Sequence, residues 1–88
     1  MGLRKPSRDL TDILAENLRF LRHRKGLSQE NLAELSGIHR TYVGSVERGE
    51  RNVTLSSLEM LASALGVSVI QLLTKKLGNN ADSNQNAG

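Results

Sequence analysis

Residues 28–49, SQENLAELSGIHRTYVGSVERG, decide the fold, because they predict two short helices joined by a tight turn. Ser28 is a good N-cap for the first helix, since its hydroxyl can accept a hydrogen bond from a free backbone N–H. Gly37 lies in the break between the helices and can adopt the positive φ that a sharp turn requires. The second helix is expected over 40–47, and His39 before it is a weak cap.

Helical patterns continue on both sides of this stretch. Apolar residues recur at helical spacing over 9–25 and again over 54–65, and a fifth helix is expected over 68–75. We therefore predict an all-α fold, a compact five-helix domain. The apolar residues expected to face its interior from the second, third and fourth helices are Leu32, Ala33, Leu35, Val43, Val46, Leu55, Leu58, Leu61, Ala62 and Leu65.

The chain of 88 residues supports a single small domain with a thin core. We expect a flexible basic arm over 1–8, the helical domain over 9–77 and a disordered polar tail over 78–88. The tail is rich in Asn, Asp, Ser, Gln and Gly, a composition that cannot bury enough apolar surface to order itself. The chain has no second domain for a ligand, so we expect no small-molecule effector.

Several function classes are disfavoured by the composition. The chain contains no cysteine, so disulfides and thiolate metal sites are excluded. Its apolar runs are short, and no apolar stretch follows the basic N-terminal residues, so we expect a cytoplasmic protein without a membrane partner. His23 and His39 lack the companions of a metal site. No nucleophile elbow or glycine-rich phosphate loop occurs, so we expect no enzyme and no cofactor.

Positive charge is clustered along the chain, which has a net charge of +3. Clustered positive charge is typical of a surface that binds phosphates, and the alternative is an ordinary solvated helix face. The clustered residues are Arg19, Arg22, Arg24 and Lys25, followed by Arg48 and Arg51.

Two segments carry a family resemblance. SQENLAELSGIHRTYVGSVERGE, over 28–50, resembles the helix-turn-helix of the Cro and cI phage-repressor family, also called the Xre family. ASALGVSVIQLL, over 62–73, resembles the closing segment of that family. RTYVGSVERGERNVTL, over 40–55, is similar to the controller proteins of restriction–modification systems, which are small dimeric regulators.

The resemblance implies a lambda-repressor-like DNA-binding domain. It further implies a transcriptional regulator that binds a near-palindromic double-stranded DNA operator as a homodimer and that occludes or recruits RNA polymerase. The alternative is an antitoxin or adaptor of the same fold whose main partner is another protein.

The second helix of the pair is expected to read the DNA. If its valines face inward, Arg40, Thr41 and Ser45 face outward and can contact bases, Arg40 by forking onto guanine. A phosphate contact or plain exposure is the alternative for each. Ser28 is expected mainly as an N-cap, and Tyr42 has partial core packing as its alternative. The residues expected on the DNA backbone or in a groove are Arg22, Ser28, Gln29, Tyr42, Arg48, Arg51 and Asn52.

Three structural roles complete the hypothesis. The resemblance implies an ion pair between Arg22 and Glu47. Gly44 lies in mid-helix, where glycine costs about 1 kcal/mol relative to alanine, so we expect the preceding helix or the DNA to approach it closely. A tolerated glycine is the alternative. The last helix has more apolar residues than one buried stripe needs, which predicts a dimer interface. Its expected members are Val69, Ile70, Leu72 and Leu73.

Overall fold

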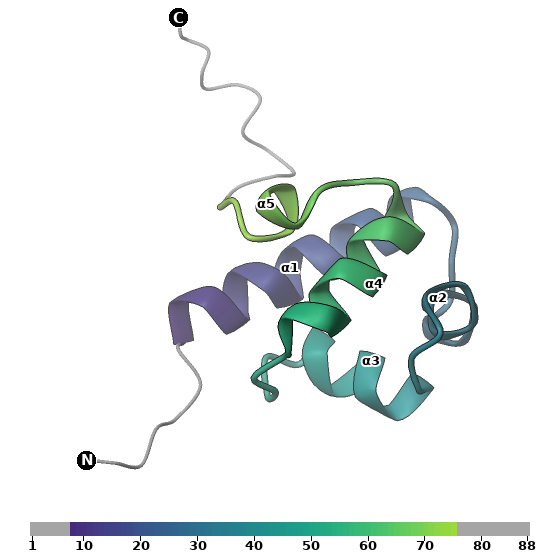
Figure 1. The fold of residues 1–88 in the computed structure, drawn as a ribbon, viewed down its shortest axis with the longest axis horizontal. Coiled ribbons are helices and arrows are strands. Elements are labelled where there is room, and N and C mark those ends of the chain that lie inside the picture. Colours follow the sequence, from purple (N-terminus) through teal and green to yellow (C-terminus); the bar gives the residue numbers. More distant parts are fainter. Residues whose placement is uncertain (1–7, 76–88) are drawn as a thin grey trace, which may run out of the picture.

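The computed structural model describes residues 8–75, and every regular element in that part is an α-helix. Figure 1 shows α1 and α4 in the middle of the view, α2 and α3 toward the lower right and α5 above α1. The predicted all-α class and five helices are confirmed for this part of the chain. In chain order the helices are α1 (Arg8–Arg24), α2 (Gln29–Ser36), α3 (Arg40–Glu47), α4 (Leu55–Leu65) and α5 (Val69–Leu72).

The structure describes only one residue of the two predicted end segments. Residue 8 belongs to α1 and not to the expected arm, because the helix begins there. The rest of the arm, and the tail over 78–88, lie outside the described residues. Within residues 8–75 no helix combines the length and apolar character needed to cross a membrane.

Local capping interactions explain where α2 begins and ends. Ser28 Oγ accepts a hydrogen bond from the Asn31 amide at 2.9 Å, and Asn31 Oδ1 accepts one from the Ser28 amide at 3.2 Å. This reciprocal pair satisfies two backbone donors at the start of α2. Gly37 follows α2 with φ +76°, as expected for the turn. His39 precedes α3 and makes no side-chain capping bond.

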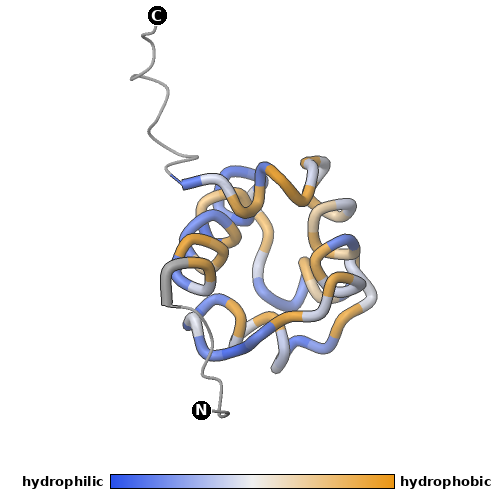
Figure 2. The backbone as a smooth tube through the Cα atoms, turned by 60° about the vertical axis from the view of Figure 1, so that its left-hand side comes forward, coloured by the Kyte–Doolittle hydropathy of each residue, from blue (hydrophilic) through white to orange (hydrophobic). Residues whose placement is uncertain are grey.

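The core is a continuous cluster of aliphatic side chains from all five described helices. Figure 2 shows apolar segments interleaved with polar ones along every helix, as amphipathic helices around one core require. The largest fully buried side chains are Leu18, Leu32, Leu61, Leu65, Leu72, Val43 and Val46.

Two leucines expected in the core are exposed instead, so these predictions are wrong. Leu35 lies on the outer side of α2, and the buried position near the end of that helix is taken by Ser36. The Ser36 hydroxyl is satisfied there, because it donates to the Leu32 carbonyl oxygen at 2.7 Å. Leu55 is the first residue of α4 and lies beyond the edge of the core.

The last helix is shorter than predicted. α5 begins after Ser68, as expected, but it ends at Leu72 instead of continuing to Lys75. The buried Asn17 of α1 donates from Nδ2 to the carbonyl oxygens of Leu72 and Thr74, each at 2.8 Å. These bonds satisfy carbonyl groups that a helix end leaves without partners.

Candidate nucleic-acid interface

α3 presents its first residues to solvent and its valines to the core. Val43 and Val46 are fully buried, as predicted. Arg40 and Thr41 are exposed, and the Arg40 side chain retains 64% of its accessible surface. α3 therefore has an inner and an outer side, with Arg40 and Thr41 on the outer side.

Ser45 does not share that exposure, so the prediction that it faces outward is wrong. The residue is only 6% exposed, and its hydroxyl donates to the Tyr42 carbonyl oxygen at 2.8 Å. Arg51, in the segment after α3, donates from Nε to Ser45 Oγ at 3.0 Å. The segment thus folds back over the helix and covers Ser45.

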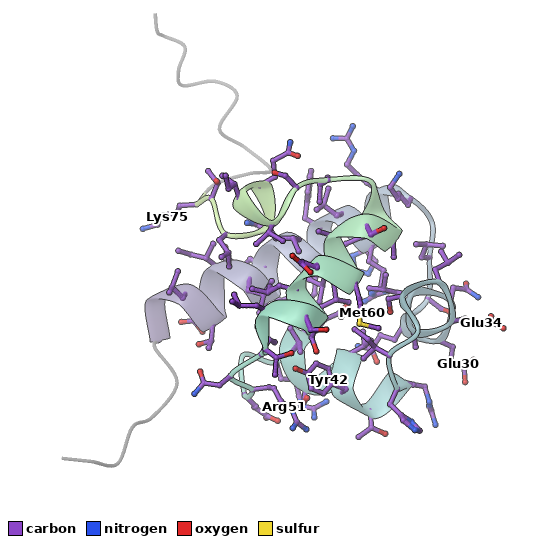
Figure 3. All side chains as sticks on the ribbon, in the orientation of Figure 1. Glu30, Glu34, Tyr42, Arg51, Met60 and Lys75 are labelled. Atoms are coloured by element: carbon purple, nitrogen blue, oxygen red, sulfur yellow. The ribbon has the colours of Figure 1, made fainter. Side chains whose placement is uncertain are left out.

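Tyr42 and Arg51 form a stacked pair beside this bond. The half-buried Tyr42 ring packs against the core, which is the alternative to a DNA contact that the sequence left open for this residue. The Arg51 guanidinium carbon lies 4.7 Å from the ring centroid, and Figure 3 shows the two side chains next to each other beside α3. Such a stack favours one arginine position while leaving the side chain exposed. Arg51 is therefore held on the same side of the molecule as α3.

A buried carboxylate anchors the C-terminal end of α3. Glu47 is 3% exposed and forms the ion pair with Arg22 that the resemblance implied. Arg22 Nε lies 2.6 Å from Oε2, and Arg22 Nη2 lies 2.9 Å from Oε1. Gln29 Nε2 also donates to Oε1, at 3.0 Å. Arg19 donates to the Glu47 backbone carbonyl oxygen. One residue thereby joins α3 to both α1 and α2.

The electrostatics of this cluster favour its charged form. Burial raises the pKa of the Glu47 carboxyl, but hydrogen bonds from Arg22 and Gln29 and the charges of Arg22 and Arg19 lower this pKa further than burial raises it. The hydrogen bond to Glu47 raises the pKa of Arg22 in turn. Glu47 is therefore an anion and Arg22 a cation over the usual pH range.

This cluster changes the interpretation of the basic run in α1. All three guanidinium nitrogens of Arg22 donate hydrogen bonds within the protein. Nε and Nη2 donate to Glu47, and Nη1 donates to the Leu27 carbonyl oxygen at 2.9 Å. Arg24 lies over the Phe20 ring, with 5.5 Å between its guanidinium carbon and the ring centroid. Arg19 and Arg22 thus serve the packing of α3, and the phosphate contact of Arg22 stays a prediction. The family resemblance implied the pair of Arg22 with Glu47, but nothing in the sequence indicated the contacts that Arg19 and Gln29 make with Glu47.

Gly44 has two close neighbours, the Arg48 side chain at the end of its own helix and Gln29 of α2, the preceding helix that we expected to approach it. A Cβ placed on Gly44 would lie 3.5 Å from Gln29 Oε1 and 3.3 Å from Arg48 Nη1. The 3.5 Å separation from Gln29 is an ordinary van der Waals contact, and the amide of this Gln29 side chain is the one that donates to the Glu47 carboxylate. The amide that we expected on phosphate is therefore already held by Glu47.

The remaining backbone-contact candidates are exposed. Ser28 acts as the N-cap described above, and Arg48 Nε donates to Glu50 Oε1 at 3.1 Å in an exposed ion pair. Asn52 is exposed in the segment that leads to α4. Their contacts with DNA stay predictions. In the described part of the chain, no three acidic or histidine side chains gather as a metal site would need.

The expected dimer residues of α5 separate into two groups. Leu72 is fully buried in the monomer's own core, so its assignment to a dimer interface is wrong. Leu72 is the one fully buried residue of the four-residue helix α5. Ile70 is 76% exposed, while Val69 and Leu73 are half-buried. These three side chains remain candidates for a contact.

A family model described as helix-turn-helix matches residues 18–72, which include α2, α3 and the turn between them. The chain belongs to this helix-turn-helix family. The resemblance to restriction–modification controllers is confirmed by individual relatives. The control protein C.SmaI of Serratia marcescens is 63% identical over 68 residues, which cover 77% of this chain and 81% of the relative.

Solved structures of similar sequence agree with the fold. The chain resembles a hypothetical transcription factor from Neisseria, with a TM-score of 0.78 and 43% identity over 92% of each chain. It also resembles the restriction–modification controller C.AhdI from Aeromonas hydrophila, with a TM-score of 0.68 and 52% identity over 70% of this chain and 94% of that one. These names describe regulators and not enzymes.

Proposed function

We propose that this helix-turn-helix protein is a transcriptional regulator that binds double-stranded DNA in a sequence-specific manner. The relatives that carry control-protein and transcription-factor names support this role. The same names support a control protein of a restriction–modification system. It would work in the cytoplasm, where binding near a promoter occludes or recruits RNA polymerase.

The observation that carries the proposal is that Arg40 and Thr41 are exposed on a helix whose opposite side is packed into the core. Val43 and Val46 hold α3 in the core, and Glu47 holds its end. The major groove admits one α-helix, and the first turn of a recognition helix supplies its base contacts. Arg40 would fork onto guanine and Thr41 would meet a thymine methyl group or a phosphate.

The flanking residues would position the helix on the duplex. The N-terminus of α2, after Ser28, offers backbone N–H groups to phosphate, and Arg48, Arg51 and Asn52 would contact the backbone on the other side. Tyr42 would steady Arg51 through the stack described above. Such phosphate contacts make binding weaken steeply as salt rises.

We further propose that the protein binds as a homodimer through α5. Ile70 is a large apolar side chain left exposed beside Val69 and Leu73, and a two-fold interface would cover all three. The two α3 helices would then lie about 34 Å apart, one turn of DNA, and the operator would be nearly palindromic.

Selection of duplexes from a random pool, followed by footprinting of the enriched site, tests the proposal. The wild type should enrich a near-palindrome. Arg40→Ala should lose about 1–3 kcal/mol of discrimination at one base pair in each half-site. Lys75→Ala is the matched control, since it removes one exposed charge across the molecule from Tyr42 and Arg51 (Figure 3). If the wild type enriches no sequence, or if both variants lose affinity equally on all duplexes, the proposal fails.

A further inference from the structure

Two glutamates lie on the outer face of α2, close to the helix that would enter the groove. Figure 3 shows Glu30 and Glu34 projecting from α2 at the edge of the molecule, and both are exposed. They border a shallow depression over the turn between α2 and α3, together with His39 and Arg40. Negative charge at this place opposes phosphate binding, so it weakens affinity for DNA in general.

Only one of the two glutamates lies within ion-pair distance of Arg40, the basic residue of this depression. Glu30 Oε2 lies 3.9 Å from Arg40 Nε, and the two side chains retain 72% and 64% of their surfaces. Glu34 forms no ion pair with any residue described in the structure. The position of Glu30 in the first turn of α2 also suits the helix dipole, but the dipole does not select Arg40 as a neighbour.

We propose that Glu30 is a positioning residue that sets which edge of Arg40 meets the DNA. This inference rests on the proposed function, in which Arg40 reads guanine. A guanidinium can fork through its Nε edge or through its two terminal nitrogens. At 3.9 Å the Glu30 carboxylate is too far for a hydrogen bond, but its charge favours the arginine position in which the Nε edge faces it. The two Nη groups are then the donors directed to guanine O6 and N7.

The Glu30 carboxylate also weakens binding to duplexes that lack the guanine recognised by Arg40. When Arg40 is not seated on guanine, Glu30 is a negative charge near phosphate with no compensating contact on the DNA. Glu30 therefore lowers affinity for non-cognate duplexes and preserves affinity for the cognate one. Its role is a gain in specificity rather than in binding strength.

The two glutamates supply a matched pair of variants for the test. The operator is first obtained by selection with the wild type, and the base pair that Arg40→Ala relaxes is identified. Equilibrium binding of the wild type, Glu30→Gln and Glu34→Gln is then measured on that operator and on the same duplex with this base pair replaced. Circular dichroism checks that all variants are folded, which the exposure of both residues favours.

Glu34→Gln should tighten binding to both duplexes alike and leave their affinity ratio unchanged. Glu30→Gln should also tighten binding to the replaced duplex, but its ratio should fall by about fivefold, the upper end for an exposed ion pair. In an Arg40→Ala background, Glu30→Gln should leave the ratio unchanged. This dependence on Arg40 is a readout that a merely structural role for Glu30 would not give.

Three results would overturn the inference while leaving the proposed function intact: an unchanged ratio in Glu30→Gln, an equal fall in both glutamate variants, or the same fall without Arg40. An operator at which Arg40→Ala relaxes no base pair would also overturn it. A wild type that enriches no sequence overturns the proposed function and, with it, this inference.

Discussion

Replacing Glu47 by alanine should be the most damaging single change to a charged residue in the described part of the chain. The substitution removes the acceptor of two hydrogen bonds from Arg22 and of one from Gln29. The guanidinium would remain largely buried, with 11% of its side chain exposed and the Leu27 carbonyl oxygen as its partner. A buried cation without its anion is costly, because the protein interior solvates charge poorly.

The size of the loss follows from this geometry. Breaking a buried ion pair by removing one partner costs about 3–5 kcal/mol. The lower figure, about 3 kcal/mol, applies here, since Arg22 keeps one carbonyl partner and some access to water. A domain of this size has a total stability of about 4–13 kcal/mol, so Glu47→Ala removes a large part of it. The melting temperature should fall by roughly 12–24 °C.

Urea and thermal unfolding followed by circular dichroism measure this loss. Glu50→Ala is the matched control, because Glu50 pairs with Arg48 at 3.1 Å on the surface and should lose less than about 1 kcal/mol. The double variant Arg22→Met/Glu47→Leu should recover most of the loss, since it removes both buried charges together. Equal losses in Glu47→Ala and Glu50→Ala would refute the reasoning.

The same carboxylate gives stability a defined pH dependence. The pKa of Glu47 is lower in the folded protein than in the unfolded chain, so its contribution is complete above the unfolded pKa and is lost as the pH falls through the folded one. The loss should therefore begin near about pH 4.3 and continue below it. Glu47→Gln should show a shallower acid limb than the wild type, and parallel acid limbs would contradict the assignment.

Three further outcomes are expected. Asn17→Ala should lose about 1–3 kcal/mol in urea unfolding, because it leaves the Leu72 carbonyl oxygen without the bond that Asn17 donates at 2.8 Å. Gly44→Ala should gain up to about 1 kcal/mol, since its Cβ displaces only the tip of the exposed Arg48 side chain; a lower melting temperature would show that the contact cannot relax. Ile70→Asp should change monomer stability by less than about 0.5 kcal/mol but raise the dimer dissociation constant in sedimentation equilibrium. An unchanged constant would remove α5 from the interface.

The bounds of the helix pair could be predicted because their signals are local. Ser28 and Gly37 act through hydrogen bonds and backbone angles within a few residues, so the sequence next to them contains the needed information. The inward direction of Val43 and Val46 follows from helical spacing for the same reason. The predicted span of α3, 40–47, accordingly agrees with the structure at both ends.

Two of the errors arise where residues outside the helix decide the outcome. Helical spacing places Ser45 near Thr41 on α3, but it contains no information on the later segment that brings Arg51 over Ser45. The end of α5 depends likewise on Asn17, 55 residues earlier in the chain than Leu72. Helical periodicity predicts which side of a helix is apolar. Whether another segment buries a residue on the polar side, as Arg51 does for Ser45, depends on tertiary packing.

The two ends of α3 differ in how they are held, and this difference explains how a thin core can fix the direction of a helix whose first turn stays exposed. The C-terminal end is fixed by the charge cluster at Glu47, which joins it to α1 and α2. The N-terminal end has no side-chain cap from His39, so the amides and side chains of its first turn are not engaged by a cap. A rigid anchor at one end fixes the direction of the helix, and the open end leaves Arg40 and Thr41 available to a partner.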